Sequence, residues 1–337
     1  MTTGPEHTRA YEPAKGRRWF RYRSTVEPIP ELPTRVGSIE LRNPVLTASG
    51  TAGHGAELSR YVDLAGLGAV VTKSVSADPW PGNPAPRVHE ATAGMLNAVG
   101  LQGPGVAAWM ADDLPALLAT GATVVASIWG RSVDDYRRAA DLLAGAPAQV
   151  VAVEVNLSCP NVEDRSGMFA HSPEATQAAM EVTAGCGRPR WAKLSPNVGD
   201  LVPIVDAAIA GGAEAVTLIN TVMGMAIDPA TRTYRLGNGG GGLSGPAIHP
   251  VAVRAVHDVA AARPDVAIVG AGGIVDAESA AELMVAGAAA VQVGTATFAD
   301  PRAPGQVAIG LVDWCRRRGI RDVGELIGAI HGPDRER

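Results

Sequence analysis

The sequence contains little cysteine and no cysteine motif that would hold a metal or an iron–sulfur cluster. Its three cysteines, Cys159, Cys186 and Cys315, form no Cys-x-x-Cys pair and lie far apart along the chain. Disulfide frameworks and zinc sites need closely spaced sets of such residues. We therefore interpret all three as free thiols in a reducing cytoplasm and expect no metal site.

Long apolar runs and an excess of basic residues are also absent. No stretch of about twenty apolar residues occurs, and the N-terminus has no apolar signal region, so we expect neither a transmembrane segment nor secretion. The formal net charge is −5 at pH 7. This charge argues against nucleic-acid binding by the whole chain and favours a small ligand.

Aromatic residues are scarce, at 4% of the chain, whereas glycine is abundant, with 40 residues. The length of 337 residues and the 46% apolar content are sufficient for a large core without disulfides or metals. Residues 1–33 are rich in proline and contain a cationic-aromatic patch at 17–23. We interpret 1–33 as an N-terminal arm, either an irregular strap or tail or a partner-docking segment, and 34–337 as one catalytic domain.

One unit recurs from Pro44 onward: a short β-branched run, a turn of glycine and small polar residues, and an Ala/Leu-rich stretch with helical periodicity. Eight such units predict an α/β fold, a closed (β/α)8 TIM barrel, rather than an open sheet. The predicted strands are at 44–50, 68–75, 123–130, 150–160, 190–196, 215–221, 266–274 and 290–296, and the clearest helices are at 132–143, 173–184, 201–210, 250–262 and 277–286.

Polar side chains follow the apolar part of each predicted strand, where a barrel of this kind has its active site. Lys73 and Lys193 occupy two of these positions. A lysine at the end of a buried strand needs an anion or another acceptor. The pair therefore predicts an anionic ligand or a cofactor that becomes anionic. The alternative is that each lysine pairs with an acidic residue, for which Glu154 is the obvious candidate.

Two glycine-rich turns, GAGG at 270–273 and GTA at 294–296, end the seventh and eighth predicted strands. Backbone N–H groups in these two loops are the usual phosphate site of the fold. Residues 237–242 also match Gly-x-Gly-x-x-Gly, but they follow no predicted strand and open no βαβ unit. We interpret them as a flexible loop before a turn at 241–246.

Cys159 lies in Asn-Leu-Ser-Cys-Pro-Asn, just past the fourth predicted strand. A thiol on the catalytic face could act as a nucleophile or as a general base, and the residues alone do not choose between these roles. We expect Cys186 and Cys315, in helical segments, to be inert and buried.

Many collinear segments resemble the dihydroorotate dehydrogenase family, from about Leu32 to Glu325. They are TASGTAGHG (47–55), VTKSVSADPWPGNPAPR (71–87), AGMLNAVGLQGPG (93–105), VNLSCPNV (155–162), AKLSPNV (192–198), LINTVMGM (218–225), GGLSGPAIHP (241–250) and GAGGI (270–274). The resemblance implies an FMN-containing barrel that oxidises dihydroorotate to orotate in pyrimidine biosynthesis. Two alternatives are an oxidoreductase acting on a neutral dihydropyrimidine and a flavin-binding barrel without this activity.

The resemblance also implies roles for individual residues. Cys159 would be the base that takes the C5 proton, and Lys73 would lie between flavin and the substrate carboxylate. Lys193 would stabilise negative charge near flavin N1 and O2. The implied substrate contacts are Lys73, Asn97, Ala98, Val99, Gly100, Leu101, Asn156, Asn161, Asn220 and Thr221. The implied flavin contacts are Ser49, Lys73, Ser74, Ser127, Asn156, Lys193, Ile219, Gly245, Gly272, Gly273, Gly294 and Thr295.

A cysteine base is typical of the soluble branch of the family, and several segments are most similar to its two-subunit, NAD-linked type. That resemblance implies a separate subunit carrying FAD and an iron–sulfur cluster, and a homodimer or heterotetramer. The chain has no cysteine set for such a cluster and no credible NAD motif of its own.

Overall fold

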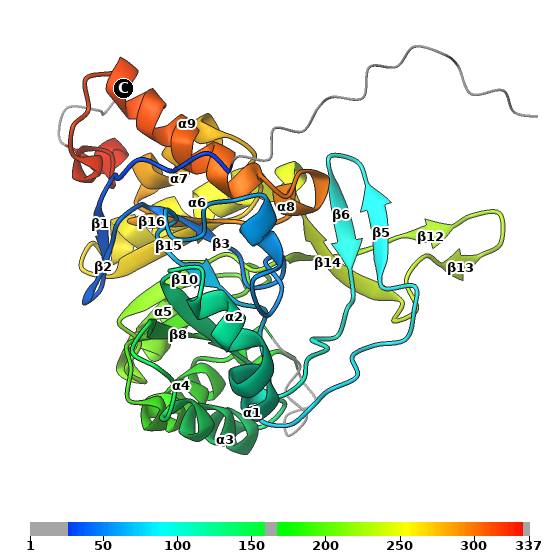
Figure 1. Cartoon of the computed structure of the whole chain (residues 1–337). Helices are drawn as coiled ribbons and strands as arrows, with labels where there is room; N and C mark the ends of the chain where they lie inside the picture. The colour runs from blue at the N-terminus through cyan, green and yellow to red at the C-terminus, as the bar shows by residue number, and fades with distance from the viewer. Residues whose placement is uncertain (1–25, 159–166, 333–337) are drawn as a thin grey trace, which may run out of the picture.

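The computed structural model describes residues 26–158 and 167–332. Its largest sheet has eight parallel strands, and a bridge between Leu46 and Ala69 closes it into a barrel (Figure 1). In spatial order the strands are β3 (Val45–Thr47), β16 (Ala290–Val293), β15 (Ala267–Ala271), β10 (Ala215–Leu218), β9 (Arg190–Lys193), β8 (Val150–Asn156), β7 (Val124–Ile128) and β4 (Val70–Val71). Each strand lies within one of the eight predicted runs, so the predicted barrel is confirmed.

Helices surround the barrel and lie close to their predicted bounds (Figure 1). The five predicted ones are α3 (Val133–Leu143), α4 (Pro173–Val182), α5 (Val202–Ala210), α6 (His249–Ala262) and α7 (Ala277–Ala286). Four further helices are α1 (Val106–Ala108), α2 (Leu114–Leu118), α8 (Ala296–Ala299) and α9 (Ala303–Arg317). Local sequence explains where such a helix starts. For example, Ser132 caps the N-terminus of α3 by accepting a hydrogen bond from the Asp135 amide at 3.2 Å.

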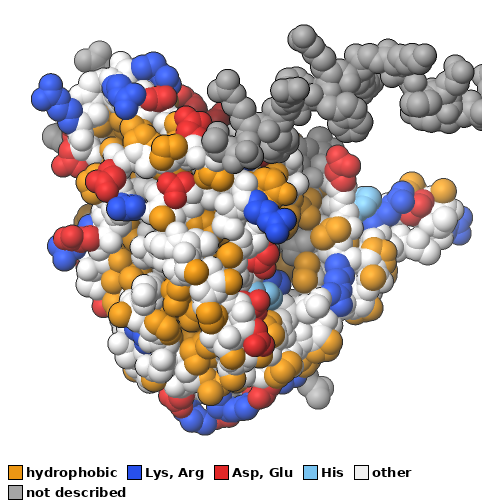
Figure 2. Space-filling view, viewed as in Figure 1, with side chains coloured by type: hydrophobic (Ala, Val, Ile, Leu, Met, Phe, Trp, Pro, Cys, Tyr) orange, Lys and Arg blue, Asp and Glu red, His pale blue; other side chains and the backbone are white. Residues whose placement is uncertain are grey.

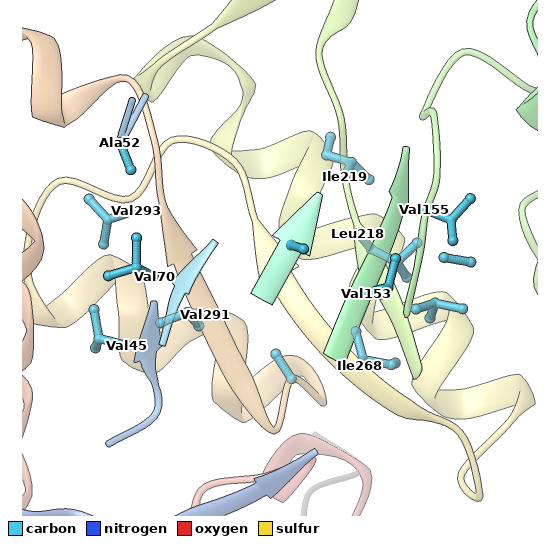
Figure 3. Close-up of a cluster of buried hydrophobic side chains, with 14 of the residues drawn as sticks. Val45, Ala52, Val70, Val153, Val155, Leu218, Ile219, Ile268, Val291 and Val293 are labelled. Atoms are coloured by element: carbon cyan, nitrogen blue, oxygen red, sulfur yellow. The ribbon is translucent and has the colours of Figure 1, made fainter. Parts of the chain in front are cut away.

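Successive side chains of each strand point alternately toward the helices and into the barrel, so the helix-facing core is separate from the barrel interior. Side chains such as Val153, Val155 and Ile268 point outward into the core beneath the helices (Figure 3). Inward-facing residues nearer the strand starts, including Ala152 and Trp191, form a separate apolar cluster. That cluster also takes side chains from the hairpin of β1 (Thr34–Val36) and β2 (Ile39–Leu41).

The interior becomes polar two residues further along several strands. Beyond the apolar Ala152, Trp191, Ala215 and Ala290 lie Glu154, Lys193, Thr217 and Gln292, all of them buried. The barrel therefore carries a polar layer above its apolar layer, on the side of the carboxyl ends of the strands.

A second sheet, which the sequence pattern does not predict, lies beside the barrel (Figure 1). It is antiparallel, with the order β11 (Val222–Met225), β14 (Gly240–Ser244), β6 (Gly94–Asn97) and β5 (Val88–Ala91). The predicted flexible loop at 237–242 and turn at 241–246 are therefore wrong over Gly240–Ser244, which is a central strand, whereas residues 237 and 238 do form a turn. Its glycines allow close approach: a Cβ on Gly242 would lie 2.0 Å from Thr221 Oγ1.

A short hairpin, β12 (Ile227–Asp228) with β13 (Thr233–Tyr234), extends from this sheet (Figure 1). Hydrophobic side chains lie on the protruding part of the molecule (Figure 2). The exposed large apolar residues of the sheet and hairpin are Val88, Met223, Met225, Ile227 and Tyr234.

The start of the described chain packs against the barrel. Ile29 and Leu32, which belong to the predicted arm, are buried in the main core. The rest of the arm, residues 1–25, lies outside the described residues. The division at residue 33 stays a prediction.

Candidate active site

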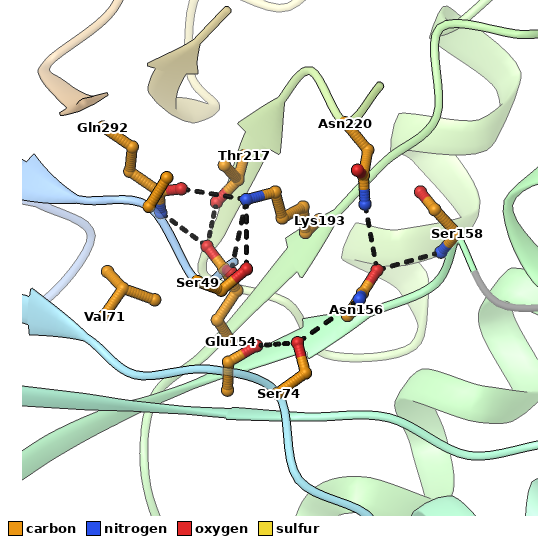
Figure 4. Close-up of polar contacts among 12 residues, drawn as sticks. Ser49, Val71, Ser74, Glu154, Asn156, Ser158, Lys193, Thr217, Asn220 and Gln292 are labelled. Atoms are coloured by element: carbon orange, nitrogen blue, oxygen red, sulfur yellow. Dashed lines mark hydrogen bonds and ion pairs between the residues drawn. The ribbon is translucent and has the colours of Figure 1, made fainter. Parts of the chain in front are cut away.

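The polar layer of the barrel contains a buried ion pair between Lys193 and Glu154. Lys193 Nζ lies 3.7 Å from Glu154 Oε1, 3.0 Å from Gln292 Oε1 and 3.3 Å from Ser49 Oγ (Figure 4). Glu154 Oε2 accepts hydrogen bonds from Gln292 Nε2 at 2.5 Å and Thr217 Oγ1 at 3.0 Å. The alternative of a lysine paired with Glu154 is thus correct for Lys193, whose charge is fixed inside the barrel mouth.

Lys73, just after β4, is in a different environment. Its backbone N–H donates to Gly53 O at 2.9 Å, and its side chain is half-buried. Within the described part of the chain, Nζ has neither a hydrogen bond nor an ion pair, so a pairing of Lys73 with Glu154 is wrong. Burial lowers the pKa of Lys73, and the positive charge of Arg87 lowers it further. The ammonium group is available to a ligand anion.

Amides and hydroxyls form a chain of hydrogen bonds across four strand ends. Asn220 Nδ2 donates to Asn156 Oδ1 at 3.1 Å, and Asn156 Nδ2 donates to Ser74 Oγ at 3.3 Å (Figure 4). Ser74 Oγ and Ser127 Oγ lie 2.8 Å apart. Four predicted site residues, far apart in sequence, are therefore in one network.

The predicted substrate loop, residues 97–101, begins at the last residue of β6. Asn97 Nδ2 donates to Gly242 O on the neighbouring β14 at 3.3 Å. Asn83 holds the loop from outside, through a hydrogen bond from its N–H to Val99 O at 3.0 Å and one from Nδ2 to Ala98 O at 3.1 Å. Leu101 has a φ of +58°, a conformation that is costly for a side chain with a Cβ. Such strain requires support from the surrounding structure, which the contacts of Asn83 with the neighbouring residues of the loop provide.

Three glycine-containing turns meet beside the strands β15 and β16. A Cβ on Gly273 would lie 2.9 Å from Gly245 O, and one on Gly245 would lie 3.5 Å from Thr295 Cγ2. The backbone N–H groups of Gly272, Gly273, Gly294 and Thr295 have no acceptor among residues 26–158 and 167–332. Unpaired N–H groups gathered in glycine turns suit an anion such as phosphate.

Some predicted residues cannot be placed, and some site residues are not predicted. Cys159 and Asn161 lie outside the described residues. Cys186 and Cys315 are buried as expected, and burial raises the pKa of both thiols.

Gln292, Thr217 and Asn197 are absent from the sequence-based site. Asn197 Nδ2 donates to Thr221 O at 3.0 Å, and its Oδ1 accepts from Met223 N at 2.8 Å. A polar residue at an inward position of an apolar strand was the available signal for Gln292 and Thr217.

Comparison with known proteins agrees with this geometry. The family model described as dihydroorotate dehydrogenase matches residues 31–314. The chain belongs to the dihydroorotate dehydrogenase family. Members of this family are flavin enzymes and oxidoreductases, so the predicted family and enzyme class are confirmed, and the dihydroorotate interpretation is supported over its alternatives.

Three relatives carry the name dihydroorotate dehydrogenase B (NAD(+)), catalytic subunit. The chain is 47% identical to that of Geotalea daltonii over 302 residues, covering 89% of this chain and 98% of the relative. It is 49% identical to that of Desulforudis audaxviator over 297 residues (88% and 96%) and 46% identical to that of Trichlorobacter lovleyi over 307 residues (90% and 99%). The likeness to these dihydroorotate dehydrogenases thus extends over nearly the whole barrel.

None of the helices in residues 26–158 and 167–332 combines the length and the hydropathy needed to cross a bilayer.

Proposed function

We propose that this chain binds FMN and oxidises dihydroorotate to orotate in pyrimidine biosynthesis. The observation that carries the proposal is that, in a barrel of this family, Lys73, whose ammonium has no partner among the described residues, directly precedes Ser74, which is hydrogen-bonded to the Asn156–Asn220 amide network. A carboxylate attached to a cyclic imide presents one anion and a set of donors and acceptors. An ammonium next to amides complements both parts of such a ligand.

The residues of the barrel mouth fit a flavin mononucleotide. The free N–H groups of Gly272, Gly273, Gly294 and Thr295 would hold its phosphate. Lys193, fixed by Glu154 and Gln292, would face the ring edge where negative charge collects on reduction. Ser49, Ser74, Ser127, Ile219 and Gly245 stay the proposed further contacts. When bound, the flavin supplies the acceptor for the hydride that leaves C6 of dihydroorotate.

The chain's own residues would orient the substrate and remove its proton. Lys73 would bind the carboxylate, and Asn97, Asn156, Asn161, Asn220 and Thr221 would hold the ring. Cys159, which lies outside the described residues, stays the proposed base for the C5 proton. At neutral pH a thiol ionises far more readily than a serine hydroxyl, so a cysteine supplies much more of the basic form than a serine would.

Anaerobic reduction tests the proposal. The flavin-loaded protein is titrated with dihydroorotate and, separately, with dihydrouracil, and flavin absorbance is followed. We expect bleaching by dihydroorotate only, since dihydrouracil lacks the carboxylate for Lys73. Equal bleaching by both compounds would establish the neutral-ring alternative, and no bleaching of fully loaded protein by either would refute the activity. A Cys159→Ser variant should keep its yellow colour and bleach much more slowly.

We also propose a cytoplasmic assembly in which a second subunit, carrying FAD and an iron–sulfur cluster, passes electrons to NAD. The names of the three relatives, each a catalytic subunit of an NAD-linked enzyme, support this proposal. With the partner the assembly would be a heterotetramer, and the alternative without it is a homodimer of this chain. Mild purification from the native host would recover the partner together with this chain.

A further inference from the structure

His249, the first residue of α6, links three elements behind the proposed phosphate site. Its Nδ1 lies 2.8 Å from Gly272 O, in the turn after β15. Its Nε2 lies 3.1 Å from Glu282 Oε2 on α7. The His249 side chain is 14% exposed and that of Glu282 is 57% exposed. The imidazole is therefore held between the turn and a carboxylate at the surface.

The contact with Gly272 O fixes the orientation of the next peptide group. Because a trans peptide is planar, its C=O and N–H point in opposite directions. When Gly272 O faces His249, the N–H of Gly273 points away from it, and this N–H has no acceptor in the described chain. The turn lies directly on the histidine: Gly273 has a φ of +69°, and a Cβ there would lie 2.6 Å from His249 Cβ.

Both contacts of the ring are with groups that can only accept a hydrogen bond. A carbonyl oxygen requires a hydrogen on Nδ1, and an ionised carboxylate requires one on Nε2. Only the imidazolium form makes both hydrogen bonds at once. The charged groups facing His249 in the described structure, Glu282 and Asp276, both belong to α7 or its N-cap. Hydrogen bonding from the Ser279 amide lowers the pKa of Asp276, and the charge of His249 contributes to that lowering.

We propose that His249 is a positioning residue for phosphate binding: by binding Gly272 O as an imidazolium, it aims the Gly273 N–H at the phosphate and adds a positive charge behind it. The inference rests on the proposed FMN site. It assigns a role to a residue that touches neither the phosphate nor the reacting atoms.

The affinity of the full-length apoprotein for FMN and for riboflavin, measured by quenching of flavin fluorescence, tests the proposal. Riboflavin has no phosphate, so it reports on the rest of the site. We expect His249→Ala to weaken FMN binding about tenfold, the effect of losing a charged hydrogen bond, and to leave riboflavin binding unchanged. His257→Ala is the matched control, because His257 lies on the same helix and contacts Asp258 and His331 instead.

A lysine variant provides the conservative replacement and the test of charge. His249→Lys can still donate to Gly272 O, and it should recover most of the FMN affinity.

Three results would overturn the inference. Unchanged FMN affinity in a folded His249→Ala protein would overturn the inference and leave the proposed function standing. An equal loss of riboflavin affinity would show a general structural role instead. A wild-type protein that does not prefer FMN to riboflavin would remove the phosphate site itself, and with it the cofactor assignment of the proposed function.

Discussion

Lys193 and Glu154 show how a charge is kept inside the barrel. Both side chains are almost fully buried, at 7% and 0% exposure, and neutral hydrogen-bonding groups complete their surroundings. Removing one partner of such a pair leaves the other charge without compensation, which costs far more than the pair as a unit contributes. Each charge of the pair therefore depends on the other for its stability inside the barrel.

Glu154→Ala should lower the free energy of unfolding by about 3–5 kcal/mol, because it leaves the Lys193 ammonium buried and unpaired. Urea denaturation of the apoprotein measures the loss. The double variant Glu154→Leu with Lys193→Met removes both charges and should regain most of the stability. A Glu154→Ala protein as stable as the wild type would show that water or another group already compensates Lys193.

Lys73 should give dihydroorotate binding a characteristic pH dependence. Its pKa is lowered by burial first and by Arg87 second. The substrate carboxylate stays ionised throughout the alkaline range, so affinity falls as Lys73 loses its proton, and this occurs at a lower pH than for an ordinary lysine. KM for dihydroorotate should rise with pH accordingly. Lys73→Gln should have a raised KM that no longer varies over this range, and a wild-type KM that stays flat would contradict the assignment.

At the scale of elements, the barrel was predictable because each unit is a local pattern. A run such as 123–130 shows its strand character within eight residues, and Ser132 marks the start of the next helix. The second sheet was not predictable, because its strands are short and pair across long separations. Asn97 of β6 pairs with Gly242 of β14, and glycine has a low intrinsic preference for strands.

The site residues likewise divide into those that the sequence pattern predicts and those that only the fold brings together. Lys73 and Lys193 stand out because they end apolar runs. Glu154 could be named from the sequence as a candidate partner of Lys193, but Gln292 could not, since it is 99 residues from Lys193 and lies within another apolar run. Likewise, His249 and Glu282 come together only because α6 and α7 are neighbours on the barrel.

Gly242→Ala tests how β14 supports the substrate site. The added Cβ would lie 2.0 Å from Thr221 Oγ1 and 2.5 Å from Thr221 Cβ, so Thr221 and the adjoining strand β11 must move. We expect a KM for dihydroorotate raised several-fold and a loss of about 1–3 kcal/mol in stability, as for other overpacked sites.

Gly240→Ala is the matched control in the same strand, because its Cβ would come no closer than 3.4 Å to Gly224 O. Steady-state kinetics and urea denaturation of the two variants, measured side by side, test whether the position of Thr221 matters. Equal behaviour of Gly242→Ala and Gly240→Ala would mean that Thr221 does not need its present position.

At the scale of the whole molecule, the barrel accounts for the oxidation of dihydroorotate but not for the transfer of the electrons to NAD. It brings the half-buried Lys73, a network of amides and the glycine turns with unpaired N–H groups to one end of a closed sheet, among the residues that the structure describes. The chain has three cysteines in all, whereas iron–sulfur clusters are usually held by four cysteine thiolates. A one-electron relay from the flavin to NAD would therefore have to come from another chain.

The purified chain should consequently oxidise dihydroorotate with an artificial acceptor such as ferricyanide, and should reduce NAD+ only when the proposed partner subunit is added. Dye reduction and NADH formation, followed in parallel on the same flavin-loaded preparation, separate the two half-reactions. Because the dye takes electrons directly from the flavin, its rate should not require the partner. NADH formation by the isolated chain at the rate of dye reduction would show that the barrel passes hydride to NAD+ itself, and the partner proposal would then be wrong although the dihydroorotate half-reaction stands.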